Sequence, residues 1–328
     1  MNLSRERLLS ESASLGVRPE ILEKVARLLS LLEAMRGHPS LKDRLALKGG
    51  TALNIFVFDV PRLSVDIDLN YVGSADRDVM LAERPDVERG IETICRAEGM
   101  AVMRAPGEHA GGKWRMRYGS VLGGSGNVEI DLNFMFRVPL WPVRHLDSRP
   151  LGHFSAMRVP VLDLHEIAAG KLVALFARRA SRDLFDAHAL FQHEGLDDER
   201  LRAGFVAIGA MNRKDWREIT LDDVDFDAKE IRDQLVPVLR DQGGDPGGDE
   251  RRDLEAWADH LASGCRRGLE RILPFRDGER EFLDRLLDHG EIRPDLITND
   301  QDLADRIAAH PLIAWKALHV RRQRGAGP

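Results

Sequence analysis

The sequence contains little cysteine and no long apolar run. Only two of its 328 residues are cysteines, Cys95 and Cys265, and they lie far apart. This excludes a disulfide framework and argues against a cysteine-ligated zinc site. No apolar stretch reaches the roughly 18 residues of a membrane-spanning helix, and the first residues lack the apolar core of a secretion signal. We therefore expect a cytoplasmic protein with no membrane partner.

Several catalytic motifs are also missing. The eleven histidines form no H-x-x-x-H or H-E-x-x-H pair, so zinc hydrolysis has no support. The chain contains neither G-x-x-x-x-G-K-[ST] nor G-x-S-x-G, which argues against a P-loop ATPase and an α/β-hydrolase. The net charge of −6 means that the whole chain is not a basic nucleic-acid binder, although local basic clusters can still bind phosphate. One such cluster is Arg178, Arg179 and Arg182.

The hydrophobic pattern predicts a mixed first half and a helical second half. Helical spacing of apolar residues predicts helices over 17–36 and 85–99, and alternation predicts strands over 45–48, 62–72, 113–121 and 127–136. Helices then dominate, beginning with 162–179 and 182–194, and residues 241–250 read as a linker. The expected fold class is α/β (α+β) in two lobes. We expect a catalytic domain over 1–160 with an N-terminal helix, and a helical domain over 161–328 that contributes substrate-binding residues.

Two carboxylates share one face of the predicted 62–72 strand. Asp66 and Asp68 lie two residues apart, and side chains at that spacing point the same way. A divalent cation such as Mg²⁺ (or Mn²⁺) would relieve their repulsion and still leave positions open for phosphates. A polar strand face in water is the alternative, and D-x-D alone does not exclude it.

Two further features strengthen the D-x-D pattern. Lys48 ends a predicted strand, and Gly49, Gly50 and Thr51 open a helix whose backbone N–H groups could cradle a triphosphate; an ordinary turn is the alternative. Asp131 alternates with apolar residues on the 127–136 strand. If that strand neighbours the 62–72 strand, Asp131 can complete a carboxylate triad or take the proton from an attacking hydroxyl.

Two basic patterns could contact phosphate. Lys113, Arg115 and Arg117 alternate with apolar residues on one strand, which favours a basic face along a nucleotide or RNA channel; a solvated outer face is equally compatible. Lys171 and Arg178 lie seven apart on one predicted helix, hence on nearly one face. A salt-bridged helical hairpin is the alternative for that pair.

The combination resembles a known family. The segments 47–53 (LKGGTAL) and 62–68 (RLSVDID) resemble the first motif of the AbiEii/AbiGii toxins, which are polymerase-β-like nucleotidyltransferases of type IV toxin–antitoxin systems related to the MenT toxins. The segments 171–178 (KLVALFAR) and 182–186 (RDLFD) are similar to the family's later motif. The C-terminal segments 281–292 and 310–316 are also similar. The resemblance spans roughly residues 45–320.

The resemblance implies an activity and a set of site residues. The chain would transfer a nucleotide from an NTP to an RNA 3′ end, with the tRNA acceptor stem as target, and so stop translation. It would act as a monomer, opposed by a separately encoded antitoxin. Two other hypotheses remain: modification of a protein by nucleotidylation or phosphorylation, or a catalytically silent nucleotide- or RNA-binding relative. The implied metal ligands are Asp66, Asp68 and Asp131; the implied catalytic residues also include Ser64, Lys171 and Asp186; nucleotide contacts would come from Lys48, Gly49, Gly50, Thr51, Ser64, Lys171, Arg178 and Arg182, and RNA contacts from Lys113, Arg115, Arg117 and Arg179. In some relatives the serine equivalent to Ser64 can be phosphorylated.

Overall fold

A computed structural model describes residues 3–107, 110–240 and 254–325. They form two compact units. Unit 1 comprises residues 3–137, 143–162 and 236–240, and unit 2 comprises residues 138–142, 163–235 and 254–325. The linker predicted at 241–250 lies outside the described residues.

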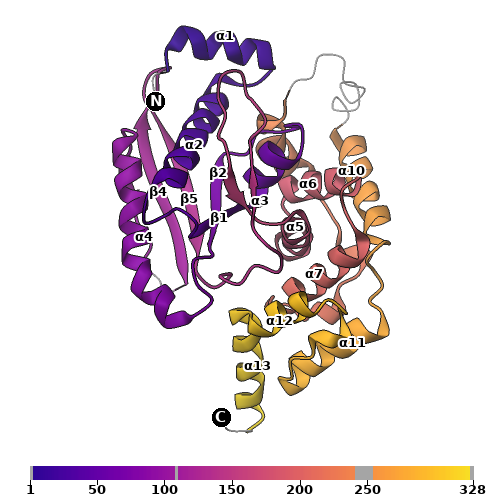
Figure 1. The fold of residues 1–328 in the computed structure, drawn as a ribbon. Helices are drawn as coiled ribbons and strands as arrows, with labels where there is room; N and C mark the ends of the chain where they lie inside the picture. The colour runs from indigo at the N-terminus through magenta and orange to yellow at the C-terminus, as the bar shows by residue number, and fades with distance from the viewer. Residues whose placement is uncertain (1–2, 108–109, 241–253, 326–328) are drawn as a thin grey trace. The chain divides into compact units, whose positions relative to one another are not determined.

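A seven-stranded mixed sheet forms the centre of unit 1 (Figure 1). Its order is β3-β4-β5-β2-β1-β7-β6. The pairs β2–β5 and β1–β7 are parallel, and the other neighbours are antiparallel. The strands are β1 (Leu45–Lys48), β2 (Asp66–Tyr71), β3 (Ala101–Arg104), β4 (Gly111–Gly119), β5 (Ser125–Asn133), β6 (Arg144–Leu146) and β7 (Val159–Val161).

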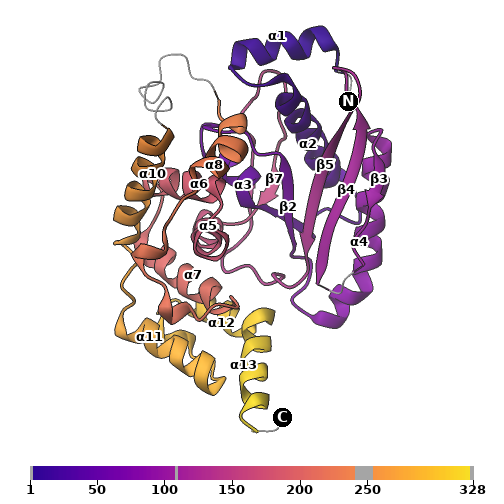
Figure 2. The same cartoon turned by 180° about the vertical axis from the view of Figure 1, so that it is seen from behind.

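Helices cover one face of this sheet. Apolar residues of α2, among them Leu22, Val25 and Leu29, are buried, and Figure 1 shows α2 and α4 on the same side of the strands. Seen from behind, β2, β4 and β5 present their opposite face (Figure 2). The helices of unit 1 are α1 (Arg5–Leu15), α2 (Pro19–Gly37), α3 (Gly49–Thr51), the π-helix η1 (Ala52–Val57), α4 (Arg77–Ala97) and the 3₁₀ turn η5 (Val236–Val238).

Two predicted elements have different bounds in the structure. The helix predicted over 85–99 begins earlier, at Arg77, because the Asp76 side chain accepts hydrogen bonds from two backbone N–H groups of the first turn. This helix continues through Pro85. The strand predicted from residue 62 begins at Asp66. Arg62 instead pairs with Leu239, a partner distant in sequence.

Unit 2 consists of helices packed around aromatic side chains. The Phe205 and Trp216 rings lie 5.1 Å apart between centroids, and Phe176 lies 5.8 Å from Trp216. The longer helices are α5 (Leu164–Arg178), α6 (Ser181–Phe191), α7 (Asp198–Ala210), α10 (Leu254–Leu269), α11 (Asp277–Asp284), α12 (Gln301–Ala309) and α13 (Pro311–Gln323). The shorter elements are η2 (Trp216–Glu218), η3 (Leu221–Asp223), α8 (Ala228–Glu230), η4 (Ile231–Leu235), η6 (Arg285–His289) and η7 (Pro294–Leu296).

The two cysteines are separate, buried and unbridged. Burial raises the pKa of each thiol to about 12, so neither is an activated nucleophile. Over the described ranges, no helix combines the length and apolar character that crossing a bilayer requires.

Candidate active site

Four charged residues occupy one row across the sheet of unit 1. Lys48 on β1 is the register partner of Asp68 on β2, Asp68 is the partner of Asp131 on β5, and Asp131 is the partner of Lys113 on β4. We call these four residues the carboxylate row. Register partners project from the same face, so two carboxylates lie side by side between two ammonium groups. The 127–136 strand therefore does neighbour the D-x-D strand, as the triad hypothesis required.

Gly49 lets the backbone approach Asp68 closely. It adopts φ +73°, and a Cβ at this position would lie 2.2 Å from Asp68 Oδ2, so only glycine fits both the conformation and the space. The turn is also tied to β2, because the Thr51 hydroxyl donates a 2.5 Å hydrogen bond to the Asp66 carbonyl. The Gly49–Thr51 turn and the D-x-D strand thus form one structural unit.

The carboxylates of the row repel each other. Burial raises the pKa of Asp131, and the nearby charges of Asp68 and Asp66 raise it further. The ammonium groups of Lys113 and Lys48 oppose this shift without cancelling it. The ionised form of Asp131 is therefore disfavoured at this site, a condition that a bound cation would relieve.

A basic strand face, formed by Lys113, Arg115 and Arg117 of β4, borders the row. Arg115 donates hydrogen bonds of 3.0 and 2.8 Å to Glu129 on β5. Burial raises the pKa of Glu129, but the hydrogen bond from Arg115 and the charge of Lys113 outweigh burial and hold the pKa below its ordinary value. The basic strand face also lines a cavity of about 510 Å³ between β3 and β5.

Ser64 and Asp66 lie where the chain enters β2. Ser64 precedes the strand and is buried, with 7% of its surface exposed. Asp66 is the first strand residue and the register partner of Glu129. Ser64 and Asp66 therefore lie close in sequence to Asp68 of the carboxylate row. Gly49, Gly50 and Thr51 directly follow Lys48 of the same row.

A second group of the predicted residues meets inside unit 2. Lys171 of α5 places Nζ 3.0 Å from Asp183 Oδ1 and 2.8 Å from Asp186 Oδ2 of α6. Arg178 Nε lies 2.6 Å from Asp183 Oδ2. We call these four residues the α5–α6 ion cluster. The carboxylates are 1% and 0% exposed, so the cluster is a buried salt-bridged hairpin.

The cations of the α5–α6 ion cluster determine its electrostatics. Burial raises the pKa of Asp183, but the charges of Lys171 and Arg178 and their hydrogen bonds outweigh burial and place the pKa below its ordinary value. The other two arginines of the predicted cluster lie nearby in sequence. Arg179 is within 4.0 Å of Asp223 and 3.8 Å of Asp225, and Arg182 is half-buried on α6.

The donor chemistry of the carboxylate row fits a hard divalent cation. In the part of the chain that the structure describes, no three or more His, Cys, Asp or Glu side chains converge closely enough to hold a metal ion. However, Asp68 and Asp131 are register neighbours on one face, and burial together with the charge of Asp68 raises the pKa of Asp131. Oxygen donors with this unrelieved repulsion suit Mg²⁺.

Sequence reasoning left two polar residues of this face out of the site. Glu129 lies two residues before Asp131 on the alternating strand β5 and is the ionic partner of Arg115 and Lys113. Asn70 lies two residues after Asp68 on β2; it is 1% exposed, and its Oδ1 has no hydrogen-bond partner among the described residues. The alternation of β2 and β5 was the available signal for both, but partners on other strands were not visible in it.

Comparisons with known proteins agree with this architecture. The family described as "Nucleotidyl transferase AbiEii toxin, Type IV TA system" matches residues 30–264, more than half of the chain. Among solved structures, the fold is similar to MenT4, a nucleotidyltransferase toxin from Mycobacterium tuberculosis. The TM-score is 0.61 and the identity 17%, over 94% of this chain and 99% of that one. No functionally curated protein matched the sequence.

Proposed function

Because the chain belongs to the AbiEii family of nucleotidyl transferase toxins, we propose that it transfers a nucleoside monophosphate from an NTP to the 3′ end of an RNA. The proposed target is the tRNA acceptor stem, whose modification blocks aminoacylation and arrests translation. The type IV toxin–antitoxin family implies a separately encoded antitoxin. We further propose that the protein acts as a cytoplasmic monomer.

One observation carries this proposal: the carboxylate row lies directly beside the basic strand face on a single sheet surface. Neighbouring acids are a centre for metal-assisted phosphoryl chemistry. Adjacent Lys and Arg side chains suit the phosphates of a nucleic acid, which dominate its affinity for proteins. This sheet face thus combines carboxylates for phosphoryl transfer with Lys and Arg side chains that can bind the phosphates of RNA, although the whole chain carries a net negative charge.

The residues of the row and the neighbouring Asp66 each have a proposed role. Asp66, Asp68 and Asp131 would hold Mg²⁺ or Mn²⁺. When bound, such an ion lowers the pKa of the attacking hydroxyl and offsets the charge of the triphosphate. The RNA 3′-oxygen forms a bond to the α-phosphorus, the bond from that phosphorus to the β-phosphate oxygen breaks, and pyrophosphate leaves. A carboxylate oxygen of Asp131 accepts the hydroxyl proton, a role that its raised pKa supports.

The cations on either side of the row orient the substrates. Lys48 and the Gly49–Thr51 turn border Asp68 on one side and suit the triphosphate. Lys113 borders Asp131 on the other side and, with Arg115 and Arg117, suits the RNA backbone. The nucleotide-contact roles implied for Lys171, Arg178 and Arg182, the RNA contact of Arg179, the acid role of Asp186 and the reactive role of Ser64 stay predictions.

The experiment incubates the purified protein with total tRNA, Mg²⁺ and each α-³²P-labelled NTP in turn. We expect label on tRNA with at least one NTP. Asp68→Asn and Asp66→Ala should abolish labelling, and growth inhibition in cells should disappear with it. Asp59→Asn is the matched control, because this exposed aspartate lies outside the carboxylate row.

Two outcomes would replace the proposal. Label on protein but on no RNA would identify a protein nucleotidyltransferase, and a parallel incubation with γ-³²P-labelled NTP would detect phosphorylation instead. No label in either incubation, with NTP binding retained, would identify a silent binding relative. Toxicity that persists in Asp68→Asn would show that the carboxylate row is not its source.

A further inference from the structure

Unit 1 contains a second cavity, on the opposite face of the sheet from the carboxylate row. It has a volume of about 330 Å³ and lies beside α2, β1, β2 and β7. Leu45 and Leu69 belong to its lining. Leu69 follows Asp68 along β2, and consecutive strand residues point to opposite faces. We call this space the α2–β7 cavity.

The floor of the α2–β7 cavity is apolar. Six of the lining residues are apolar side chains that are at most 5% exposed. They come from α2, from the loop that precedes β1, and from β1, β2 and β7: Leu32, Met35, Leu41, Leu45, Leu69 and Val159. A floor of this kind accommodates the non-polar body of a small molecule, and the volume lies at the lower end of the range of ligand pockets, about 300–1,000 Å³.

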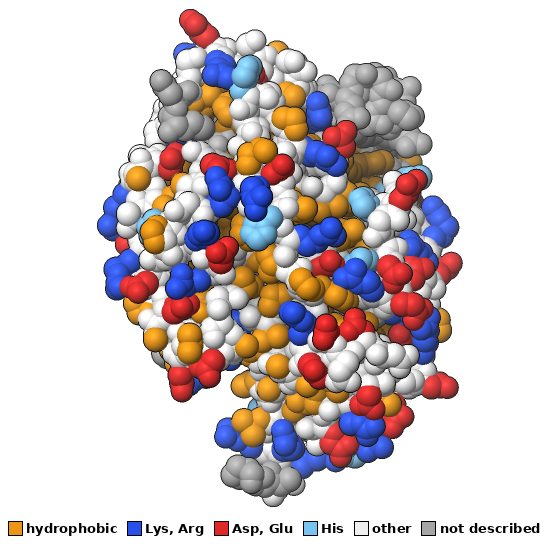
Figure 3. Space-filling model, in the orientation of Figure 1, with side chains coloured by type: hydrophobic (Ala, Val, Ile, Leu, Met, Phe, Trp, Pro, Cys, Tyr) orange, Lys and Arg blue, Asp and Glu red, His pale blue; other side chains and the backbone are white. Residues whose placement is uncertain are grey.

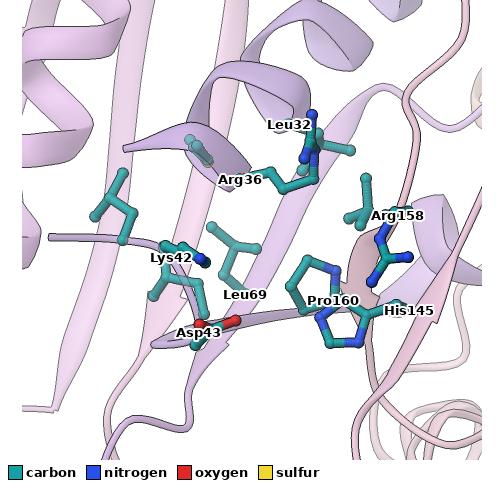
Figure 4. A pocket seen from close by; sticks show the side chains of 12 residues that line it. Leu32, Arg36, Lys42, Asp43, Leu69, His145, Arg158 and Pro160 are labelled. Carbon is teal, nitrogen blue, oxygen red and sulfur yellow. The ribbon is translucent and has the colours of Figure 1, made fainter. Parts of the chain in front are cut away.

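The rim is basic. Arg36, Lys42, His145 and Arg158 line the mouth together with one acid, Asp43. Figure 4 shows Lys42 and Asp43 on one side of the cavity and His145 and Arg158 on the other. In the space-filling view, basic side chains gather with a histidine over the part of unit 1 where α2 and β1 lie (Figure 3).

The rim charges are largely unneutralised by the protein. Arg36 pairs with Glu33, but no ion pair involves the side chain of Lys42 or Arg158 among the described residues. The carboxyl end of α2 contributes only about half a negative charge. Cations from the loop before β1 and from the residue preceding β7 therefore face one space without a bound counter-charge, and an anion would supply it.

The backbone at this rim adopts an uncommon conformation. Asp43 has φ 60° and Arg158 has φ 50°, and they are two of the four non-glycine residues with positive φ in the described chain. Aspartate tolerates this left-handed region in ordinary turns, whereas for Arg158 it is uncommon, so the surrounding structure holds the Arg158 backbone in place. The Arg158 backbone N–H also donates a 2.7 Å hydrogen bond to Asp147 Oδ1, which anchors the backbone at this position.

We propose that the α2–β7 cavity binds a small hydroxylated phosphate ester of the size of a mononucleotide. Lys42, Arg158 and Arg36 bind the phosphate, and His145 adds a ring nitrogen. The apolar floor receives the body of the ligand. Asp43, the one carboxylate, accepts hydrogen bonds from hydroxyl groups, as acids do toward a ribose diol. A polynucleotide backbone would not use an enclosed apolar floor, so a small molecule fits better.

The test uses AMP as probe and the Met35 methyl group as reporter. The full chain is labelled with ¹³C at the methionine methyl groups, and Met35→Leu assigns the Met35 signal. The titration is run in EDTA, which suppresses metal-dependent nucleotide binding at the carboxylate row. AMP should shift the Met35 signal saturably, while the signal of Met116, which is buried on β4, stays in place. Adenosine and inorganic phosphate should each bind at least tenfold more weakly than AMP.

Variants test each part of the proposal. Lys42→Gln and Arg158→Gln should each weaken AMP binding at least tenfold, and Asp43→Ala should weaken AMP more than it weakens inorganic phosphate. Arg5→Gln, which removes an exposed cation of α1, should change nothing. Because the readout is binding, it does not depend on whether the chain transfers nucleotides.

Three results would overturn the proposal. An unchanged Met35 signal at millimolar AMP would show that the cavity does not bind this chemistry. Equal affinity for AMP and inorganic phosphate would reduce the site to a simple anion contact. A short RNA that shifts Met35 at lower concentration than AMP would assign the rim to a polynucleotide.

Discussion

Carboxylates occur in two very different settings in this molecule. In the carboxylate row of unit 1, Asp131 lies beside Asp68, and its pKa is raised by burial and by its acidic neighbours. In the α5–α6 ion cluster of unit 2, Asp183 is more deeply buried, yet its pKa is lowered because Lys171 and Arg178 contact it directly. The cluster is internally neutralised and holds two helices together. The row keeps a repulsion between carboxylates that a bound cation would relieve, and this is the reason why we propose it as the site of chemistry.

The variant Lys171→Met should have the largest effect, and it tests the contrast between the two groups of carboxylates. The variant leaves Asp183 and Asp186 buried without their shared cation, so the free energy of unfolding should fall by about 3–5 kcal/mol. Urea unfolding measures the loss. Lys229→Met, at an exposed lysine of α8, is the control and should change little. A loss below about 1 kcal/mol would show that the cluster does not hold the fold.

A smaller effect is expected at the turn that supports the row. Gly49→Ala forces a Cβ against Asp68 Oδ2 at a positive φ, which should cost about 1–3 kcal/mol of stability and lower nucleotide transfer. Gly37→Ala is the matched control: nothing lies within 4 Å of its Cβ position, and the change should be neutral or stabilising. Equal behaviour of the two variants would contradict the close approach.

Acid unfolding tests whether the pKa of Asp183 is lowered, in contrast to the raised pKa of Asp131. Because the pKa of Asp183 is lower in the folded chain than the roughly 3.9 of an unfolded aspartate, the folded state binds fewer protons there. The contribution of ionised Asp183 to the free energy of unfolding is complete above the pKa of this residue in the unfolded chain. It is lost as the pH falls through the lower pKa of the folded chain. The stability difference between the wild type and Asp183→Asn should therefore shrink on going from pH 6 to pH 3. A constant difference would mean that the cluster does not lower this pKa.

The smallest effect concerns the basic strand face. Arg117→Gln should reduce the salt dependence of tRNA binding by about 0.7–1 in the slope of log K against log salt concentration, as expected for one lost phosphate contact. Filter binding between 50 and 200 mM KCl measures it. Arg5→Gln, which lies on α1, should leave the slope unchanged. An unaltered slope in Arg117→Gln would place the RNA elsewhere.

Local sequence patterns predicted much of unit 1. Alternation placed Asp66, Asp68 and Asp131 on polar strand faces, and the observed register puts Asp68 beside Asp131. The α1 helix was missed although Ser4 caps it through the Arg7 N–H. Strands β3 and β6 were missed as well, because they are short and mostly exposed, so they lack the alternation of apolar and polar residues that predicts a strand.

Other features depend on contacts that no local pattern contains. The chain before β2 does not belong to the sheet, because Leu63 donates its N–H to the Val238 carbonyl. Likewise, helical spacing put Lys171 and Arg178 on one face of a helix, and Asp183 and Asp186 lie on the next helix, α6. Whether Lys171 faces a nucleotide or these acids is a matter of helix packing, and the structure pairs it with the acids.

The most direct test measures transfer and stability together in Asp131→Asn and Asp183→Asn. If the carboxylate row performs the chemistry, Asp131→Asn should lose more than about 100-fold in transfer to tRNA, with a free energy of unfolding within about 0.5 kcal/mol of the wild type or above it. Asp183→Asn should instead lose stability. An Asp131→Asn variant that keeps its transfer rate, or that fails only because it unfolds, would contradict the account.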